Sequence, residues 1–294
     1  MTEPLRVNID FENIGETARK GVRRTAVFLG LGINAALDPT FRKYELTDIS
    51  PIHLVPSNVP EETIAHFKTE FGRWIIANGL RELIETFALF LDRTHNACLI
   101  MASHKGKITF DDATLWQPAF HQKGIEDKLK VFQSRFGVRP NFPERIGTIQ
   151  HVRNCFTHRQ GVVGKQDCKD TDELLLKWTG FDFFIETHTG ETIDLVLPLK
   201  EEIHLKDGGT ACLRFSERVR GFKLGTPVTL ESKDLIEICN FILMSTDQLL
   251  KSVFDFAKSI GITDAGETSH AQDSNNTLKG DGGGTAALPH PSQK

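Results

Sequence analysis

Apolar residues recur at steps of three and four along residues 61–103, and this spacing predicts one long α-helix with a buried face. A serine, an asparagine, a proline and two acids at 57–62 favour a helix start there. The Asn78-Gly79 pair marks a point at which the helix is able to kink. Phe71, Trp74 and Phe87 fall on the apolar stripe, so we expect them in the core and not on a base-stacking surface.

The same spacing predicts four further helices, at about 16–37, 125–136, 144–159 and 231–260. The last of these carries the strongest apolar stripe, whose members include Leu235, Ile238, Ile242, Leu249 and Val253. Residues 5–9 fit a short strand. An irregular connection is expected after the first helix, because this stretch contains Pro39, Pro51, Pro56 and Pro60.

The pattern changes after Gly161. Short β-type runs occur at 181–185, 193–197 and 211–215, and glycine-containing turns at 189–190, 207–209 and 225–227 lie between or after them. The sequence therefore predicts a mainly α protein: a helical bundle with a small antiparallel β insertion, at about 162–230, between the 144–159 helix and the last helix.

This pattern divides the chain into an N-terminal extension (1–59), a helical domain that contains the insertion (60–262) and a tail (263–294). The tail has no aromatic residue and many small polar ones. It cannot bury enough surface to offset the entropy cost of ordering, so we expect it to be disordered.

Composition narrows the class of protein. The 294 residues are 39% hydrophobic and 25% charged, as in ordinary soluble globular proteins. A net charge of −4 argues against wholesale wrapping of nucleic acid but is compatible with a local basic groove. No apolar run is long enough to span a bilayer, so no membrane association is expected. The five cysteines are scattered without zinc-type spacing, which favours reduced thiols in the cytoplasm, with no metal and no cofactor.

The candidate chemistry lies at the end of the 144–159 helix, in Arg153-Asn154-Cys155-Phe156-Thr157-His158. A guanidinium can neutralise and orient phosphate oxygens, and an imidazole can move a proton near neutral pH. Arg145 and His151 show a similar spacing, as chance would allow, but only Arg153 is followed directly by Asn.

Helical geometry places the polar members of this segment together. Asn154 and His158 are four residues apart and share a face with His151, whereas Arg153 lies on the flank, from which its long side chain can reach that face. His158 falls in the last turn, where the helix dipole favours imidazolium, and Gly161 is a suitable terminator. The residues expected to face the core are Val152, Cys155 and Phe156.

This combination resembles the HEPN domain, a helical-bundle superfamily that includes many ribonucleases of prokaryotic toxin and antiviral systems. Its signature is Arg, four to six residues, then His, commonly with Asn straight after the Arg, near the end of an inner helix. The match covers roughly residues 61–260, and the carried-over catalytic residues are Arg153, Asn154 and His158. Some members have a Tyr two residues after the His; here that position is Gln160, so regulation through that Tyr is not expected.

The resemblance implies a metal-independent endoribonuclease that acts as a homodimer, with two motifs brought together across a groove. His158 would handle the proton of the RNA 2′-hydroxyl or of the leaving oxygen, Arg153 would stabilise charge on the scissile phosphate, and Asn154 would orient phosphate or His158. The products would be a 2′,3′-cyclic phosphate and a 5′-hydroxyl. A role as a toxin or anti-phage effector, with an antitoxin or defence-system partner, belongs to the same expectation.

Two alternatives stay open at this point. The chain could be a non-catalytic HEPN module that binds RNA, a nucleotide or a protein partner, or a dimer whose motif helix serves packing only. In the packing alternative the motif is a polar helix end, with Arg153 paired to a carboxylate and His158 capping the C-terminal carbonyls. One of three acids on the long helix could contact the motif's Arg or His, although most of them are expected to be solvated: Glu82, Glu85 and Asp92.

Other polar residues also have two interpretations. His151 and Arg159 are candidate substrate-binding residues, and the alternative for each is a solvated surface position. A cluster in the insertion could form a basic strand edge that guides RNA, although a solvated face is the more common outcome; it comprises Arg214, Arg218, Arg220 and Lys223.

Overall fold

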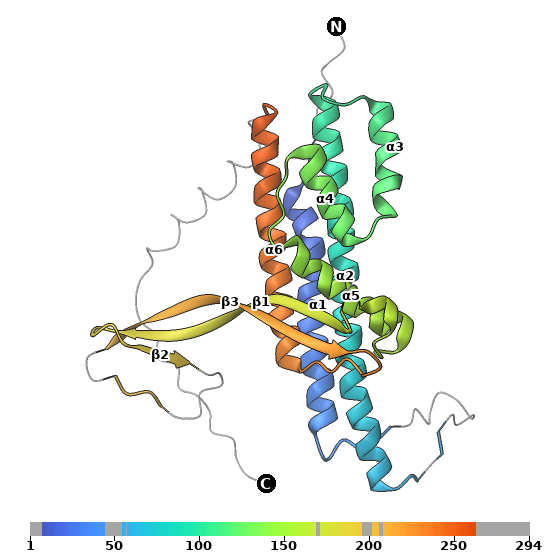
Figure 1. Cartoon of the computed structure of the whole chain (residues 1–294), viewed down its shortest axis with the longest axis vertical. Helices are drawn as coiled ribbons and strands as arrows, with labels where there is room; N and C mark the ends of the chain where they lie inside the picture. Colours follow the sequence, from blue (N-terminus) through green and yellow to red (C-terminus); the bar gives the residue numbers. More distant parts are fainter. Residues whose placement is uncertain are drawn as a thin grey trace, which may run out of the picture.

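The structure is a computed structural model that describes residues 8–44, 55–56, 58–168, 171–195, 202–205 and 208–262. These residues form six α-helices, one short 3₁₀ helix and three strands (Figure 1). In chain order they are α1 (Phe11–Leu37), α2 (Glu61–His104), α3 (Phe110–His121), α4 (Ile125–Phe136), α5 (Pro143–Arg159), η1 (Lys165–Asp167), β1 (Glu173–Thr187), β2 (Thr192–Leu195), β3 (Gly209–Lys223) and α6 (Ser232–Ser259).

The helices predicted from apolar spacing are confirmed as α1, α2, α4, α5 and α6. α1 begins five residues earlier than expected because the carboxylate of Asp10 caps it, accepting from the N–H of Asn13 at 2.9 Å. α2 continues as a helix through Asn78-Gly79. Of the predicted strand at 5–9, residues 5–7 lie outside the described residues, and residues 8 and 9 are not in a strand; the predicted tail also lies outside them.

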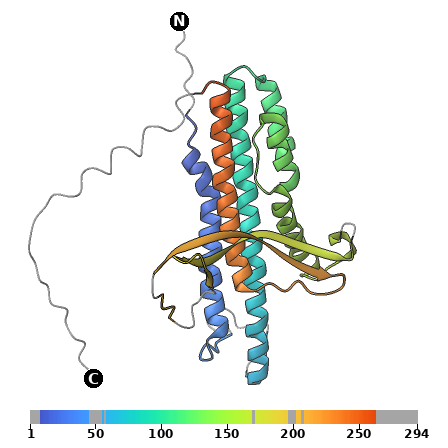
Figure 2. The ribbon, with the colours of Figure 1, turned by 60° about the vertical axis from the view of Figure 1, so that its left-hand side comes forward.

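The core lies where α1, α2 and α6 pack on one another along the long axis of the bundle (Figures 1 and 2). α5 and α4 pack on α2 as well, so the motif helix is part of the bundle. The largest buried side chains include Phe87 and Phe90 of α2, Phe132 of α4 and Phe241 of α6. No helix among the described residues is both long enough and apolar enough to cross a membrane.

The three strands form one antiparallel sheet in the order β2-β1-β3, which confirms the predicted β insertion between α5 and α6. Paired residues include Trp178 with Arg218 and Asp182 with Arg214. The sheet crosses the lower half of the bundle (Figure 2), and its far end projects away from the helices as an arm (Figure 1). Leu174, Leu176 and Trp178 are buried near the bundle.

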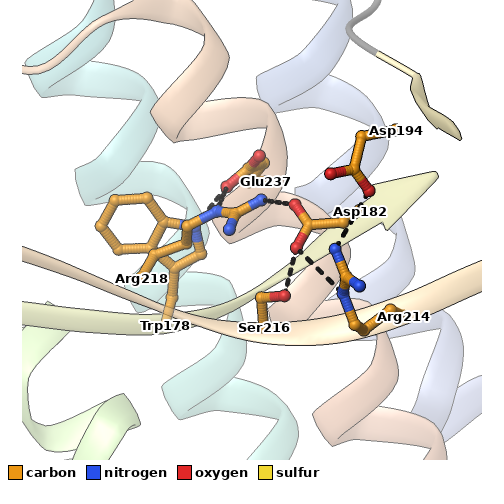
Figure 3. Close-up of polar contacts among 7 residues, drawn as sticks. All are labelled: Trp178, Asp182, Asp194, Arg214, Ser216, Arg218 and Glu237. Atoms are coloured by element: carbon orange, nitrogen blue, oxygen red, sulfur yellow. Dashed lines mark hydrogen bonds and ion pairs between the residues drawn. The ribbon is translucent and has the colours of Figure 1, made fainter. Parts of the chain in front are cut away.

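A polar network fastens the sheet to α6 (Figure 3). The indole N–H of Trp178 donates to Glu237 Oε2 at 2.9 Å, and Arg218 donates both to that oxygen at 3.2 Å and to Asp182 at 2.6 Å. The hydrogen bond from Arg218 lowers the pKa of Asp182 below its usual value.

The arginines of the insertion are compensated by carboxylates. Arg214 lies 3.2 Å from Asp194, and Arg220 donates to Asp234 at 3.0 Å. Because Arg218 is paired as well, these three residues do not form the unpaired basic edge that the sequence suggested as one possibility for RNA guidance.

The expected burial of Trp74 and Phe71 is wrong, whereas that of Phe87 is confirmed. Trp74 is 59% exposed and Phe71 is 37% exposed. The reason is the length of α2: none of its residues before Ile76 is buried, so its first part carries an apolar stripe beyond the packed core. Periodicity reports which residues share a face, not how far along the helix its partners extend.

Candidate functional site

α5 holds the predicted motif, and its position is fixed from two sides. Its buried stripe comprises Ile146, Ile149, Val152 and Cys155. At its C-terminal end, Gln160 and Gly161 adopt left-handed backbone angles, and the N–H of Gly161 donates to the carbonyl of Cys155 at 3.2 Å. The chain then pairs with the segment before α6, where the N–H of Val228 donates to the carbonyl of Gly161 at 2.7 Å. The motif residues therefore project from a firmly anchored helix end.

Arg153 points toward α2. Its Nη2 donates to Glu85 Oε1 at 2.7 Å, and its Nη1 donates to Asn154 Oδ1 at 3.2 Å. Of the three acids of the long helix considered for this contact, Glu85 is the one that binds the motif arginine, although a solvated position was expected for most of them. Asp92, in contrast, is bound to Lys128 and His121, and Glu82 lies 3.3 Å from Arg24.

Asn154, His158 and His151 line one cavity of about 250 Å³, together with Arg159, Gln166 and Asp167. This confirms that the three residues share a face of α5. His158 is exposed, while Asn154 and His151 are half-buried. Arg153 is not among the residues that line this cavity, so Asn154 connects the two parts of the motif.

Arg159 lines the cavity but is bound by a carboxylate. Its Nε donates to Asp167 Oδ2 at 2.6 Å, and its Nη2 donates to the other carboxylate oxygen. Asp167 is buried and also accepts the N–H of Gly164 at 2.8 Å, which fixes its orientation. The hydrogen bond to Asp167 raises the pKa of Arg159. A substrate phosphate would meet an arginine whose charge is already compensated.

The neighbouring thiol is buried and protonated. Cys155 is fully buried, and burial raises its pKa to about 11. The thiol is therefore protonated at neutral pH, which leaves imidazole, amide and guanidinium as the reactive groups of this region.

Sequence reasoning missed Gln166 and Asp167, the far wall of the cavity. They lie in η1, beyond the turn at 160–164. A carboxylate eight residues after an arginine is too common a pattern to have indicated the pair. The contact arises because the left-handed backbone at the end of α5 turns the chain back toward the helix.

Comparison of the chain with protein-family models, with curated proteins and with solved structures finds no match. The HEPN resemblance therefore stays a prediction that rests on the motif residues and their placement. Among the described residues, no three His, Cys, Asp or Glu side chains are grouped as metal ligands.

Proposed function

We propose that the protein is a metal-independent endoribonuclease of the HEPN type that acts as a homodimer. The supporting observation is the position of Asn154, which accepts a hydrogen bond from Arg153 at 3.2 Å and lines the same cavity as His158. The motif thus presents a cation, an amide and an exposed imidazole from one anchored helix end. Those groups suffice for phosphodiester transesterification.

In the proposed reaction, the RNA 2′-oxygen attacks the adjacent phosphorus and the bond to the 5′-oxygen breaks. The imidazole of His158 accepts the 2′-hydroxyl proton, and the imidazolium so formed gives a proton to the leaving 5′-oxygen. Arg153 neutralises the developing charge on the phosphate oxygens, and Asn154 orients them. The products are a 2′,3′-cyclic phosphate and a 5′-hydroxyl.

The position of Arg153 relative to His158 supports the proposal of a dimer. Arg153 faces α2 and does not line the cavity of His158 in the same chain. Two motif helices related by a two-fold axis would place the arginine of one copy against the histidine of the other, and the site would occur twice.

A role in toxicity or phage defence, with a partner protein, belongs to the same proposal.

One observation favours the alternative, a non-catalytic module that binds RNA, a nucleotide or a protein. Both arginines near the motif are held by carboxylates, Arg153 by Glu85 and Arg159 by Asp167. A phosphate must compete with these acids before either cation can stabilise a transition state.

Cleavage of labelled single-stranded RNA in EDTA separates the two functions. The wild-type protein should release fragments with cyclic phosphate ends, and Arg153→Ala and His158→Ala should each lose on the order of a hundredfold or more in rate. His188→Ala, which removes an exposed histidine from the arm, serves as the matched control. Intact RNA with wild-type protein, or variants that cut equally well, would exclude the nuclease.

A mixing experiment tests the shared site. Co-expressed Arg153→Ala and His158→Ala chains should regain roughly a quarter of wild-type activity, because half of the dimers are mixed and each mixed dimer keeps one intact Arg–His combination. No recovery would show that arginine and histidine act within one chain.

A further inference from the structure

The first half of α2 carries an open groove that is distinct from the cavity of His158. It consists of two adjoining cavities of about 270 and 510 Å³, one against α1 and one against the end of α5 and residues 227–230. Trp74, Asn78 and Arg81 line both cavities. The groove thus runs across α2, and these three side chains form its centre.

Trp74 provides an aromatic surface in this groove. It is 59% exposed, and the ring of Phe71 lies nearly parallel to it, with centroids 6.3 Å apart. The other two tryptophans are not open to a ligand in this way. Trp178 is buried, and the guanidinium carbon of Arg135 lies 4.1 Å from the ring centroid of Trp116. An exposed, supported indole is suited to stacking on a planar ligand.

Arg81 provides a cation without a carboxylate. The two other arginines of the groove are paired, Arg24 with Glu82 at 3.3 Å and Arg73 with Glu70 at 2.7 Å. Within the described part of the chain, Arg81 makes no ion pair, and its Nε is buried without a hydrogen-bond partner.

Asn78 holds Arg81 beside the indole. The oxygen of Asn78 accepts from Arg81 Nη1 at 3.4 Å, and its nitrogen donates to the carbonyl of Trp74 at 2.7 Å. A partly buried guanidinium without a counter-charge is suited to an anionic ligand.

We propose that this groove binds an unpaired nucleotide of an RNA strand, with its base stacked on Trp74 and its phosphate at Arg81. The inference rests on the proposed function, because it treats the groove as the path by which substrate reaches the motif. Arg81 lies one helical turn, about 6 Å of rise, before Glu85, and Glu85 holds Arg153. A strand anchored at Trp74 therefore leads toward the motif arginine.

Binding is measured in the His158→Ala background with EDTA, so that cleavage does not interfere. The probes are a fluorescein-labelled single-stranded RNA and an abasic strand of equal length. Trp74→Ala should weaken RNA binding about tenfold and leave binding of the abasic strand unchanged, whereas Trp74→Phe should keep most of the affinity. Arg81→Gln should weaken both probes and reduce the slope of log K against log salt by about 0.7.

Phe110→Ala is the matched control, because Phe110 is 77% exposed at the start of α3. Equal RNA affinity for wild type, Trp74→Ala and Arg81→Gln would overturn the inference. Loss of the dimer by light scattering in Trp74→Ala would also overturn it, by showing that the groove is a protein contact.

The two proposals fail separately. Cleavage that depends on His158 but not on Trp74 would support the nuclease proposal and contradict the proposed nucleotide binding in the groove. RNA binding that depends on Trp74, without any cleavage by the wild-type protein, would support nucleotide binding in the groove and contradict the nuclease proposal.

Discussion

Glu85 accepts a hydrogen bond from Arg153 at 2.7 Å, so the motif arginine is tied to the long helix and not to the histidine of its own motif. The carboxylate is half exposed, and such pairs contribute little to folding stability. Its effect is electrostatic, because it compensates the cation that would meet the scissile phosphate.

Removing that negative charge should strengthen RNA binding. Glu85→Gln keeps an oxygen acceptor for Arg153 but leaves the guanidinium uncompensated, so we expect affinity to rise about threefold at low salt. The gain should shrink as salt screens the charges. Fluorescence anisotropy in the His158→Ala background measures both effects.

The control is Asp255→Asn, which removes one charge from an exposed position near the end of α6. An equal gain in both variants would indicate a net-charge effect. Unchanged or weaker binding in Glu85→Gln would show that Glu85 does not hold Arg153 back from phosphate.

Much of the bundle follows from apolar spacing because each of its main helices buries a stripe. α3 was not predicted because its apolar stripe is short: Phe120 is its one buried residue, and Ala113 and Trp116 are only partly buried against the core. Its available signal was the capping box of Thr109 and Asp112, with a hydrogen bond from the N–H of Asp112 to Thr109 Oγ1 at 3.0 Å. β1 and β3 are longer than the apolar runs suggested, because pairs with polar members, such as Glu173 with Lys223 and Thr179 with Glu217, continue the ladder beyond those runs.

Only the part of the candidate site that lies on a single helix can be predicted from the sequence. Helical spacing placed His151, Asn154 and His158 on one face, and all three line one cavity. Contacts that depend on the path of a loop, such as that of Arg159 with Asp167, leave no local pattern. Trp74 is exposed because the packed core ends before it along α2. The spacing of apolar residues within α2 does not show where its packing partners end.

A buried ion pair joins α2 to α4 and should be costly to break. Lys128 Nζ lies 2.7 Å from Asp92 Oδ1, and both side chains are almost fully buried. Lys128→Met should lower the free energy of unfolding by about 3 kcal/mol, because it leaves the buried carboxylate of Asp92 without its ammonium partner and with His121 alone at 2.9 Å. Lys128→Met combined with Asp92→Leu should recover part of the loss in urea denaturation. A single variant that loses under about 1 kcal/mol would contradict a tightly coupled pair.

The contact between Trp178 and Glu237 should control the attachment of the sheet to α6. Glu237→Leu removes the acceptor of both Trp178 Nε1 and Arg218 Nε, so we expect a loss of about 2 kcal/mol in unfolding free energy and faster hydrogen exchange in β1 and β3. Glu237→Gln is the matched control, because its amide oxygen can still accept from Trp178. If both variants exchange equally fast, the carboxylate charge and not the hydrogen bond anchors the sheet.

His95 is a buried titratable group between α2 and α3. Its ring stacks on Phe120 at 3.8 Å, and its Nδ1 lies 2.7 Å from Gln117 Oε1. Because Gln117 Nε2 donates to the carbonyl of Asp92, the amide oxygen faces His95, so Nδ1 carries the proton. Burial lowers the pKa of His95 to about 4, which means that the folded protein holds it neutral.

Stability should therefore fall as the solution is acidified through the range in which only the unfolded chain binds this proton. The unfolded pKa is 6.5, so the contribution of His95 is complete above that pH and is lost progressively as pH falls toward 4. Between pH 7 and 5 the loss should be about 2 kcal/mol, since one pKa unit corresponds to about 1.4 kcal/mol. Urea denaturation of His95→Phe should show a flatter dependence over that interval, whatever its absolute stability. The exposed-site control His188→Gln should keep the wild-type slope; a wild-type slope in His95→Phe as well would mean that another group carries the pH dependence.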